Sequence, residues 1–317
     1  MKRRDFLKKA AVGAVAAYAS PKLSGYAADG DQPPLMQREL GKTGRKLSII
    51  GFGGIVVSGV PQEDANASVR YAVERGVNYF DVAPSYGDAE ERLGPALEPY
   101  RKDVFLACKT NKRTKDEAAK ELQESLRKLR TDYLDLYQLH ALTTMEELET
   151  CFAPGGAMEV FLEARDKGQI KLIGFSAHSV EVALEAMERF AFDSILFPIN
   201  YLLYSQGNFG PQVVQKAQEK GVGRLALKAM AKTHWAEGAE RNYKKCWYEP
   251  ISNREEAELG LRFTLSEPIT AAIPPGEPTL FRMALDLASR FRPITAEERN
   301  ALLQGAEGLT PIFKHPA

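Results

Sequence analysis

Short apolar runs recur along the chain, and each is rich in the branched and aromatic residues that favour strands. Between the runs lie amphipathic patterns typical of helices. Within residues 114–130, for example, Ala119, Leu122, Leu126 and Leu129 recur every three or four positions and share one helical face. The runs predict eight strands, at residues 47–53, 77–82, 103–110, 133–140, 170–176, 194–200, 222–228 and 268–274.

Alternation of strands and helices predicts the α/β class. Eight such strands over roughly 270 residues match a closed (β/α)8 TIM barrel, whose usual size is about 250 residues. An open doubly wound sheet is the alternative, and it would normally carry a GxGxxG motif after its first strand. The stretch Gly51–Val56 has valine in place of the third glycine, so we predict the barrel. Thr114, Ser252 and Thr295 each precede a glutamate by three residues and mark expected helix starts.

Residues 1–34 differ from the rest of the chain and are predicted to be a signal peptide and linker. A basic start precedes an apolar stretch, Ala10–Ala19, that is too short to span a bilayer, and small residues suited to cleavage follow. Arg3–Lys8 (RRDFLK) resembles the twin-arginine signal. We therefore expect export by the twin-arginine translocation machinery to the periplasm, no stable membrane span, and a single barrel domain over residues 35–317.

Composition narrows the classes of partner and site. The chain has 42 basic and 42 acidic residues, so its overall charge gives no reason to expect a nucleic-acid partner. Cys108, Cys151 and Cys246 are widely spaced and lack the CxxC or CxxH patterns of zinc sites. We expect no metal site and at most one disulfide.

Polar side chains stand at the carboxyl ends of consecutive predicted strands, where a barrel of this kind places its active site. Asp81 ends the second strand and Tyr86 follows in its loop, while Lys109 ends the third strand and His140 the fourth. Taken singly, such residues are more often turn formers or core residues. Four together, one of them an ammonium that needs a partner if buried, indicate a functional site.

These four groups suit proton transfer to a carbonyl. A phenol with a pKa of about 10 is a poor base at neutral pH, but a nearby ammonium favours the phenolate. We expect Lys109 to lower the pKa of Tyr86 and Asp81 to hold Lys109 protonated and in place. His140 would donate to the carbonyl oxygen or relay the proton. The paired carboxylates of glycoside hydrolases are missing from the set.

The stretches that carry these residues resemble the aldo-keto reductase family. RELGKTGRKLSIIGFGG (38–54) is similar to the family's first strand and to the N-terminal β-hairpin that closes its barrel. NYFDVAPSYG (78–87), FLACKT (105–110) and LDLYQLH (134–140) carry the four catalytic residue types of the family at matching positions. The resemblance extends over residues 35–311, nearly the whole chain after the predicted signal.

The resemblance implies a fold, an activity and a cofactor. Family members reduce aldehydes or ketones, or oxidise alcohols in the reverse direction, with a nicotinamide cofactor bound in the barrel mouth. Tyr86 would be the general acid, Lys109 and Asp81 would tune it, and His140 would orient the carbonyl. The usual cofactor is NADP(H). NAD(H) is possible here, because a carboxylate, Glu277, follows Gly276 where the family commonly has a cation for the 2′-phosphate.

The resemblance also implies a set of cofactor-binding residues, and some of their neighbours depart from the family pattern. The set is Gly53, Gly54, Ser176, Asn200, Lys228, Gly276 and Arg282. Ala177 replaces the asparagine that usually follows Ser176, and Leu196 replaces a usual glutamine. Lys228 replaces an aromatic residue found in many members, and it is either a contact for the pyrophosphate or ribose or a solvated rim lysine.

Two functions from different classes fit these residues. The first is an NAD(P)H-dependent carbonyl reductase. The second is a catalytically slow NADP(H)-binding regulatory or sensor protein on the same barrel, which export would favour because soluble nicotinamide pools are largely cytosolic. Trp235, Trp247 and Tyr248 follow the seventh strand and either wall the substrate pocket or pack their own loop.

Overall fold

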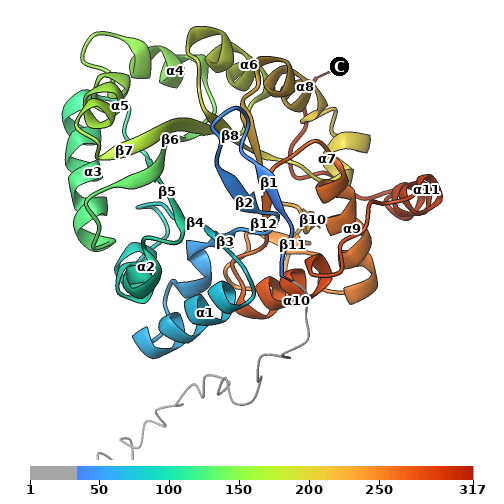
Figure 1. Ribbon diagram of the computed structural model, residues 1–317. Helices are drawn as coiled ribbons and strands as arrows, with labels where there is room; N and C mark the ends of the chain where they lie inside the picture. The colour runs from blue at the N-terminus through green and yellow to red at the C-terminus, as the bar shows by residue number, and fades with distance from the viewer. Residues whose placement is uncertain (1–33, 317) are drawn as a thin grey trace, which may run out of the picture. The chain divides into compact units, whose positions relative to one another are not determined.

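The computed structural model describes residues 34–316, in which a ring of parallel strands is surrounded by helices (Figure 1). One sheet of eight strands runs in the order β12-β9-β8-β7-β6-β5-β4-β3. The N–H of Gly51 donates to the carbonyl of Ala272 at 2.9 Å and joins the first strand to the last. The strands are β3 (Phe52–Gly53), β4 (Tyr79–Asp81), β5 (Phe105–Thr110), β6 (Leu134–Leu142), β7 (Ile170–Ala177), β8 (Ser194–Pro198), β9 (Gly223–Leu227) and β12 (Ala271–Ile273). The predicted (β/α)8 barrel is confirmed, and the doubly wound sheet is excluded.

Helices connect the strands and cover the outside of the barrel. Thr295 and Glu298 form the predicted capping box at the last helix, whereas the helix predicted to start at Ser252 is capped by Asn253, one residue later. The helices are η1 (Gly54–Val57), α1 (Gln62–Glu74), α2 (Ala89–Leu97), η2 (Glu98–Tyr100), α3 (Lys115–Lys128), α4 (Met145–Phe152), α5 (Ala157–Asp166), α6 (Val180–Arg189), α7 (Tyr201–Gln206), α8 (Pro211–Lys220), α9 (Arg254–Ser266), α10 (Pro278–Ala288) and α11 (Ala296–Gly305).

The N-terminal hairpin lies across one end of the barrel, in front of the strands in Figure 1. Its strands β1 (Gln37–Glu39) and β2 (Lys46–Ser48) pair antiparallel, as the sequence predicts. The hairpin turn approaches the barrel closely, since a Cβ added at Gly41 would lie 2.5 Å from the backbone nitrogen of Gly223. Gly41 also has a φ of +53°, which favours glycine. The hairpin therefore closes the end of the barrel opposite the carboxyl ends of the strands.

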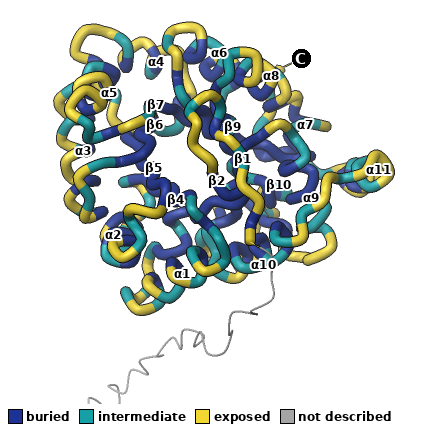
Figure 2. The backbone as a smooth tube through the Cα atoms, viewed as in Figure 1, coloured by how far each residue is buried: buried dark blue, intermediate teal, exposed yellow. Residues whose placement is uncertain are grey.

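The strands are almost entirely buried, and exposure is concentrated on the outer helices (Figure 2). Inside the barrel, Leu40 and Leu47 of the hairpin pack with Tyr79, Phe105 and Leu136 of the strands. A second apolar layer lies between the strands and the helices. Because the lower barrel is filled by side chains, only the carboxyl ends of the strands leave room for a pocket. The cysteines at 108, 151 and 246 are buried within these layers as free thiols.

A second hairpin interrupts the connection from β9 to α9. Its strands are β10 (Ala231–His234) and β11 (Tyr248–Pro250), and we call the residues between them, 235–247, the strap. The ammonium of Lys245 donates to the carbonyls of Ile55 at 3.0 Å and Val56 at 2.9 Å, in the helix that follows β3. The strap thus connects the end of the seventh barrel strand to that of the first.

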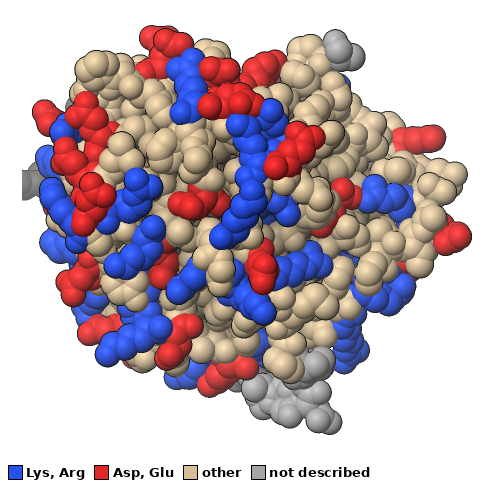
Figure 3. All heavy atoms as spheres, turned by 45° about the horizontal axis from the view of Figure 1, so that its top comes forward, with Lys and Arg blue, Asp and Glu red and all other residues tan. Residues whose placement is uncertain are grey.

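Acidic and basic side chains are interspersed on the face shown in Figure 3. Among residues 34–316, no helix combines the length and the apolarity needed to cross a membrane. The predicted signal peptide falls on residues before Pro34, outside the described part of the chain.

Candidate active site

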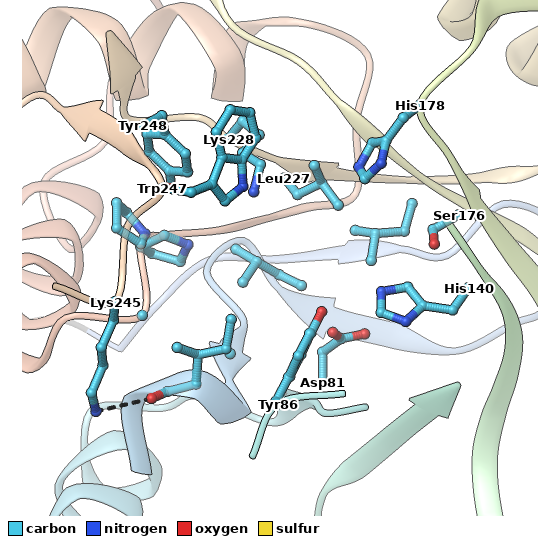
Figure 4. A pocket seen from close by; sticks show the side chains of 17 residues that line it. Asp81, Tyr86, His140, Ser176, His178, Leu227, Lys228, Lys245, Trp247 and Tyr248 are labelled. Atoms are coloured by element: carbon cyan, nitrogen blue, oxygen red, sulfur yellow. Dashed lines mark hydrogen bonds between the residues drawn. The ribbon is translucent and has the colours of Figure 1, made fainter. Parts of the chain in front are cut away.

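A pocket of about 260 Å³ opens at the carboxyl ends of the strands (Figure 4). It combines an apolar floor with a few polar groups, as small-molecule sites do. Three of the four predicted catalytic side chains line it, and the fourth, Lys109, lies fully buried behind Asp81. The predicted residues in the lining are Gly53, Asp81, Tyr86, His140, Ser176, Lys228 and Gly276.

Lys109 and Asp81 form an ion pair with almost no exposure to solvent. The ammonium of Lys109 donates to Oδ1 of Asp81 and, at 3.0 Å, to the carbonyl of Val82. Burial alone would lower the pKa of Lys109, but the interactions with Asp81 and Tyr86, that with the Asp81 carboxylate first, outweigh it and raise that pKa. The ammonium therefore stays charged beside the pocket.

Two further side chains hold the carboxylate of Asp81. The hydroxyl of Tyr79 and the amide Nε2 of Gln138 each donate to Oδ2 of Asp81 at 3.2 Å. Parallel pairing aligns Asp81 with Ala107, two residues before Lys109, so the neighbouring strands β4 and β5 bring the carboxylate and the ammonium to the same end of the barrel. Buried charges persist only when their hydrogen-bonding capacity is met in this way.

Tyr86 lies in the turn after β4, where its N–H donates to the carbonyl of Ala83 at 3.1 Å. The ammonium of Lys109 is 5.2 Å from the centre of its ring. Burial raises the pKa of Tyr86, the charge of Lys109 lowers it, and the charge of Asp81 raises it again. The expected net lowering of this pKa is therefore wrong for the free protein, because burial and Asp81 outweigh the ammonium. The phenol keeps its proton at neutral pH.

His140, at the end of β6, packs edge-on against Tyr86 with ring centres 5.8 Å apart. Burial, with the positive charge of Lys109 next in size, lowers the pKa of His140 to about 2, so its ring is neutral at physiological pH. Nδ1 of the ring lies 2.8 Å from the side-chain oxygen of Asn111. The contact at Nδ1 leaves Nε2 as the ring atom available to a ligand.

The implied cofactor-binding residues do not all reach the pocket. Asn200 is buried and holds the fold, since its oxygen accepts the N–H of Leu203 and its amide donates to the carbonyl of Lys228 at 3.0 Å. Gly54 packs against Val82, where a Cβ would lie 2.7 Å from Cγ2. Arg282 places its guanidinium over a tyrosine ring of α1, 5.2 Å from the ring centre.

Lys228 lies directly after β9 in a left-handed conformation, with a φ of +68°. Its ammonium is 4.8 Å from the ring centre of Tyr248 and 5.3 Å from that of Trp247. Burial lowers the pKa of Lys228 to about 8. Lys228 is therefore a pocket residue and not a solvated lysine at the rim. Trp247 and Tyr248 form part of the pocket wall.

The residues present fit a nicotinamide cofactor. Gly276 lines the pocket and packs closely against Ile55, since a Cβ there would lie 2.3 Å from Ile55 Cγ2. The volume is below the range of about 300–1,000 Å³ for whole ligands, which suits the reacting end of a dinucleotide. Among residues 34–316, no group of three or more His, Cys, Asp or Glu side chains is arranged to hold a metal.

Sequence reasoning missed several groups at this site. His178, two residues past Ser176, lines the pocket, and burial lowers its pKa to about 4. Lys245 lines it from the strap. His178 was accessible to sequence reasoning, because it lies two residues after the end of a predicted strand. Lys245 had no such signal, since its position depends on how the strap folds back.

The chain is similar to known proteins in sequence and in fold. The profile described as "Aldo/keto reductase family" matches residues 49–298. The oxidoreductase YqkF of Bacillus subtilis (strain 168) is 25% identical over 303 residues, covering 84% of this chain and 95% of YqkF. L-galactose dehydrogenase of Arabidopsis thaliana is 26% identical over 212 residues, covering 61% and 65%. The holo form of aldo-keto reductase AKR11C1 from Bacillus halodurans has a TM-score of 0.68 at 25% identity, covering 88% of this chain and 98% of that chain.

Proposed function

Because this chain belongs to the aldo/keto reductase family and is an NAD(P)H-dependent oxidoreductase, we propose that it reduces an aldehyde or ketone with Tyr86 as general acid. One observation carries the assignment of roles: a neutral phenol, a neutral imidazole and a buried ammonium–carboxylate pair meet at one pocket. The same groups would serve the reverse oxidation of an alcohol.

The proton side of the reaction follows from these groups. As a carbonyl gains a hydride, its oxygen becomes an alkoxide and takes the proton of Tyr86. The tyrosinate that remains is stabilised by the ammonium of Lys109, which Asp81 keeps charged and in place. Because burial raises the pKa of Tyr86, the phenol of the free protein holds the proton that it donates to the substrate.

His140 serves as a neutral hydrogen-bond partner of the carbonyl oxygen. For Nε2 to donate, Nδ1 must accept, and the amide of Asn111 offers a donor in one of its two orientations. A neutral imidazole adds no charge of its own near the ammonium of Lys109.

A nicotinamide cofactor supplies the hydride when bound. Gly53, Ser176 and Gly276 would line its binding space. We propose NADP(H) as the preferred form, with NAD(H) as the alternative. The carboxylate of Glu277 accepts the N–H of Lys245 at 2.7 Å, and this engagement reduces the repulsion expected at a 2′-phosphate. Steady-state comparison of NADPH with NADH tests the preference.

The reductase function is tested by the substitution Tyr86→Phe. We expect loss of carbonyl reduction by at least about a hundredfold, because the general acid is removed. Binding of the cofactor, followed by quenching of protein fluorescence, should stay near the wild-type value, which separates lost chemistry from lost folding. Reduction of an aldehyde panel that survives in the Phe variant would remove Tyr86 from the role of acid.

The second function, a slow cofactor-binding sensor, is less favoured. A sensor needs no buried ion pair beside a protonated phenol. Tight cofactor binding without turnover of any carbonyl by wild-type protein would nevertheless support it.

We further propose that the chain is exported to the periplasm by the twin-arginine machinery. The support is the RRDFLK sequence at Arg3–Lys8, followed by a short apolar stretch. Replacing Arg3 and Arg4 by lysine should retain the full-length precursor in the cytoplasm, as followed by cell fractionation and mass. An unchanged distribution would remove the proposal without affecting the assigned chemistry.

A further inference from the structure

Lys228 is held in an uncommon backbone conformation that directs it into the pocket. A lysine with a φ of +68° is unusual, since this region favours glycine. Two hydrogen bonds fix it: the carbonyl of Lys228 accepts the Asn200 amide at 3.0 Å and the N–H of Ala231 at 2.9 Å. Strained residues of this kind concentrate at functional sites.

The other charged groups of the pocket already have hydrogen-bond partners. Asp81 and Lys109 neutralise each other. The ammonium of Lys245 donates to two backbone carbonyls, and the backbone N–H of Lys245 donates to the carboxylate of Glu277. Among the described residues, the ammonium of Lys228 has no hydrogen-bond acceptor and no carboxylate partner, only the faces of two aromatic rings.

The remaining titratable side chains around the pocket do not offset this charge. Tyr86 is a neutral phenol, and His140 and His178 are neutral imidazoles. Two ammonium groups line the pocket, those of Lys228 and Lys245. That of Lys245 is held by two backbone carbonyls, so among the described residues that of Lys228 is the one without a hydrogen-bond partner. Aromatic faces attract a cation but leave room for an anion on its open side.

The position of this charge indicates which ligand it serves. Figure 4 shows Lys228 across the pocket from Tyr86, on the side where His178 lies. Lys245 lies on a different part of the wall, where its ammonium donates to the carbonyl of Ile55. The charge of Lys228 is felt at both imidazoles, because it contributes to lowering the pKa of His140 and of His178. An anion bound there would belong to the molecule whose carbonyl contacts His140.

We propose that Lys228, framed by Trp247 and Tyr248, binds an anionic oxygen group of the substrate, so that the preferred substrates are aldehydes or ketones that also carry a carboxylate. This inference rests on the proposed reductase function and specifies its substrate class. The ammonium gives charge recognition, and the two rings keep it within the pocket. An uncharged aldehyde would leave this cation without a partner.

The test compares matched substrates with matched variants. Succinic semialdehyde is paired with butanal, and para-carboxybenzaldehyde with its methyl ester. Lys228→Met keeps an unbranched side chain and removes the charge, whereas Lys228→Arg keeps the charge. The control Lys232→Met removes a neighbouring lysine that is paired with Glu256. We expect Lys228→Met to lower kcat/KM about 10- to 100-fold for the carboxylate substrates only, the range of one hydrogen bond to a charged group.

The proposal is supported if Lys228→Met lowers kcat/KM for the carboxylate substrates only, if Lys228→Arg recovers much of this activity, and if Lys232→Met shows no such loss. If Lys228→Met affects the charged and the uncharged substrate of each pair equally, or affects neither, the proposal is overturned. Weaker binding of NADPH or NADH by Lys228→Met, without substrate discrimination, would also overturn it and assign the ammonium to a cofactor phosphate.

A binding measurement keeps this inference separable from the reductase function. Calorimetry with succinate and with succinamide, on protein saturated with oxidised cofactor, needs no turnover. Binding of succinate alone, lost in Lys228→Met, supports the anion subsite even if no carbonyl is reduced. Absence of succinate binding by wild-type protein contradicts it even if carbonyls are reduced.

Discussion

The pair Lys109–Asp81 is the residue-level feature on which both folding and catalysis depend. Lys109 is 0% exposed and Asp81 1%, so neither charge can be satisfied by water if its partner is removed. Tyr79 and Gln138 can satisfy one oxygen of the carboxylate but not its charge. The same pairing that stabilises a tyrosinate therefore makes the site sensitive to substitution.

We predict that Lys109→Met lowers the free energy of unfolding by about 3–5 kcal/mol, because it leaves a buried carboxylate unpaired. Urea denaturation of the purified protein measures this change. Adding Asp81→Asn should restore part of the stability without restoring activity. Arg127→Met is the control: it breaks the exposed pair with Glu124, and its cost should stay below about 1 kcal/mol. Equal losses for Lys109→Met and Arg127→Met would contradict the reading of a buried pair.

The pH dependence of reduction follows from two pKa values at the site: that of Tyr86 is raised and that of His140 is lowered. The acid needs its proton, and burial raises the pKa of Tyr86, so activity should fall only at a pH above the ordinary titration range of a phenol. His140, with a pKa of about 2, stays neutral and adds no acidic limb near pH 6.5. The profile of kcat/KM for an uncharged aldehyde reports the free enzyme and checks this. A limb near pH 6.5 that disappears in a His140 variant would show that the imidazole titrates normally.

At this scale the sequence predicts residue types well and their energetics poorly. The four catalytic candidates could be found because each lies at the end of a strand of recognisable pattern or in the loop that follows it. They are Asp81, Tyr86, Lys109 and His140. The direction of the Tyr86 pKa could not be predicted, because it depends on how much burial opposes the ammonium. Such balances are set by tertiary packing that no local pattern encodes.

At the scale of elements, the strap is the part of the site that the sequence left undefined. The sequence marks aromatic residues after the seventh strand but no strand pattern, and β10 and β11 are short and joined by an irregular segment. Lys245 fixes the strap by bonds to Ile55 and Val56, which lie far from it along the chain. By contrast, the eight barrel strands were predictable because they are mostly buried and therefore rich in apolar residues.

Lys245→Met should weaken the connection between the strap and the first barrel strand. We expect faster release of bound cofactor, by about tenfold, since two hydrogen bonds from an ammonium are lost. Stopped-flow displacement of NADPH measures the release rate. Lys244→Met, which removes the neighbouring positive charge, is the control for the loss of charge. An unchanged release rate in Lys245→Met would mean that the strap does not limit the exit of cofactor.

For the whole molecule, the two ends of the barrel carry separate tasks. The N-terminal hairpin fills one end with Leu40 and Leu47, and the polar groups occupy the other. Changes at the hairpin should therefore alter stability while leaving the chemistry of the folded protein intact.

Two glycines of the hairpin turn test this separation. Gly41→Ala would place a Cβ 2.5 Å from the nitrogen of Gly223 and 2.6 Å from the oxygen of Gly221, whereas a Cβ at Gly44 would meet nothing within 4 Å. Both glycines have positive φ, so Gly44→Ala carries only the conformational cost, about 1–2 kcal/mol. We expect Gly41→Ala to lose clearly more stability in urea denaturation, with near-normal kcat/KM in the folded fraction. Equal losses at the two positions would mean that the hairpin moves freely.

The three buried thiols can be used to measure which part of the protein opens in solution. Cys246 lies in the strap, Cys151 in α4, and Cys108 in β5 beside Lys109. Each thiol can react with a reagent in solution only when its surroundings open, so its labelling rate reports the free energy of that opening. Mass spectrometry of a timed labelling reaction would separate movement of the strap, read at Cys246, from unfolding of the barrel wall, read at Cys108.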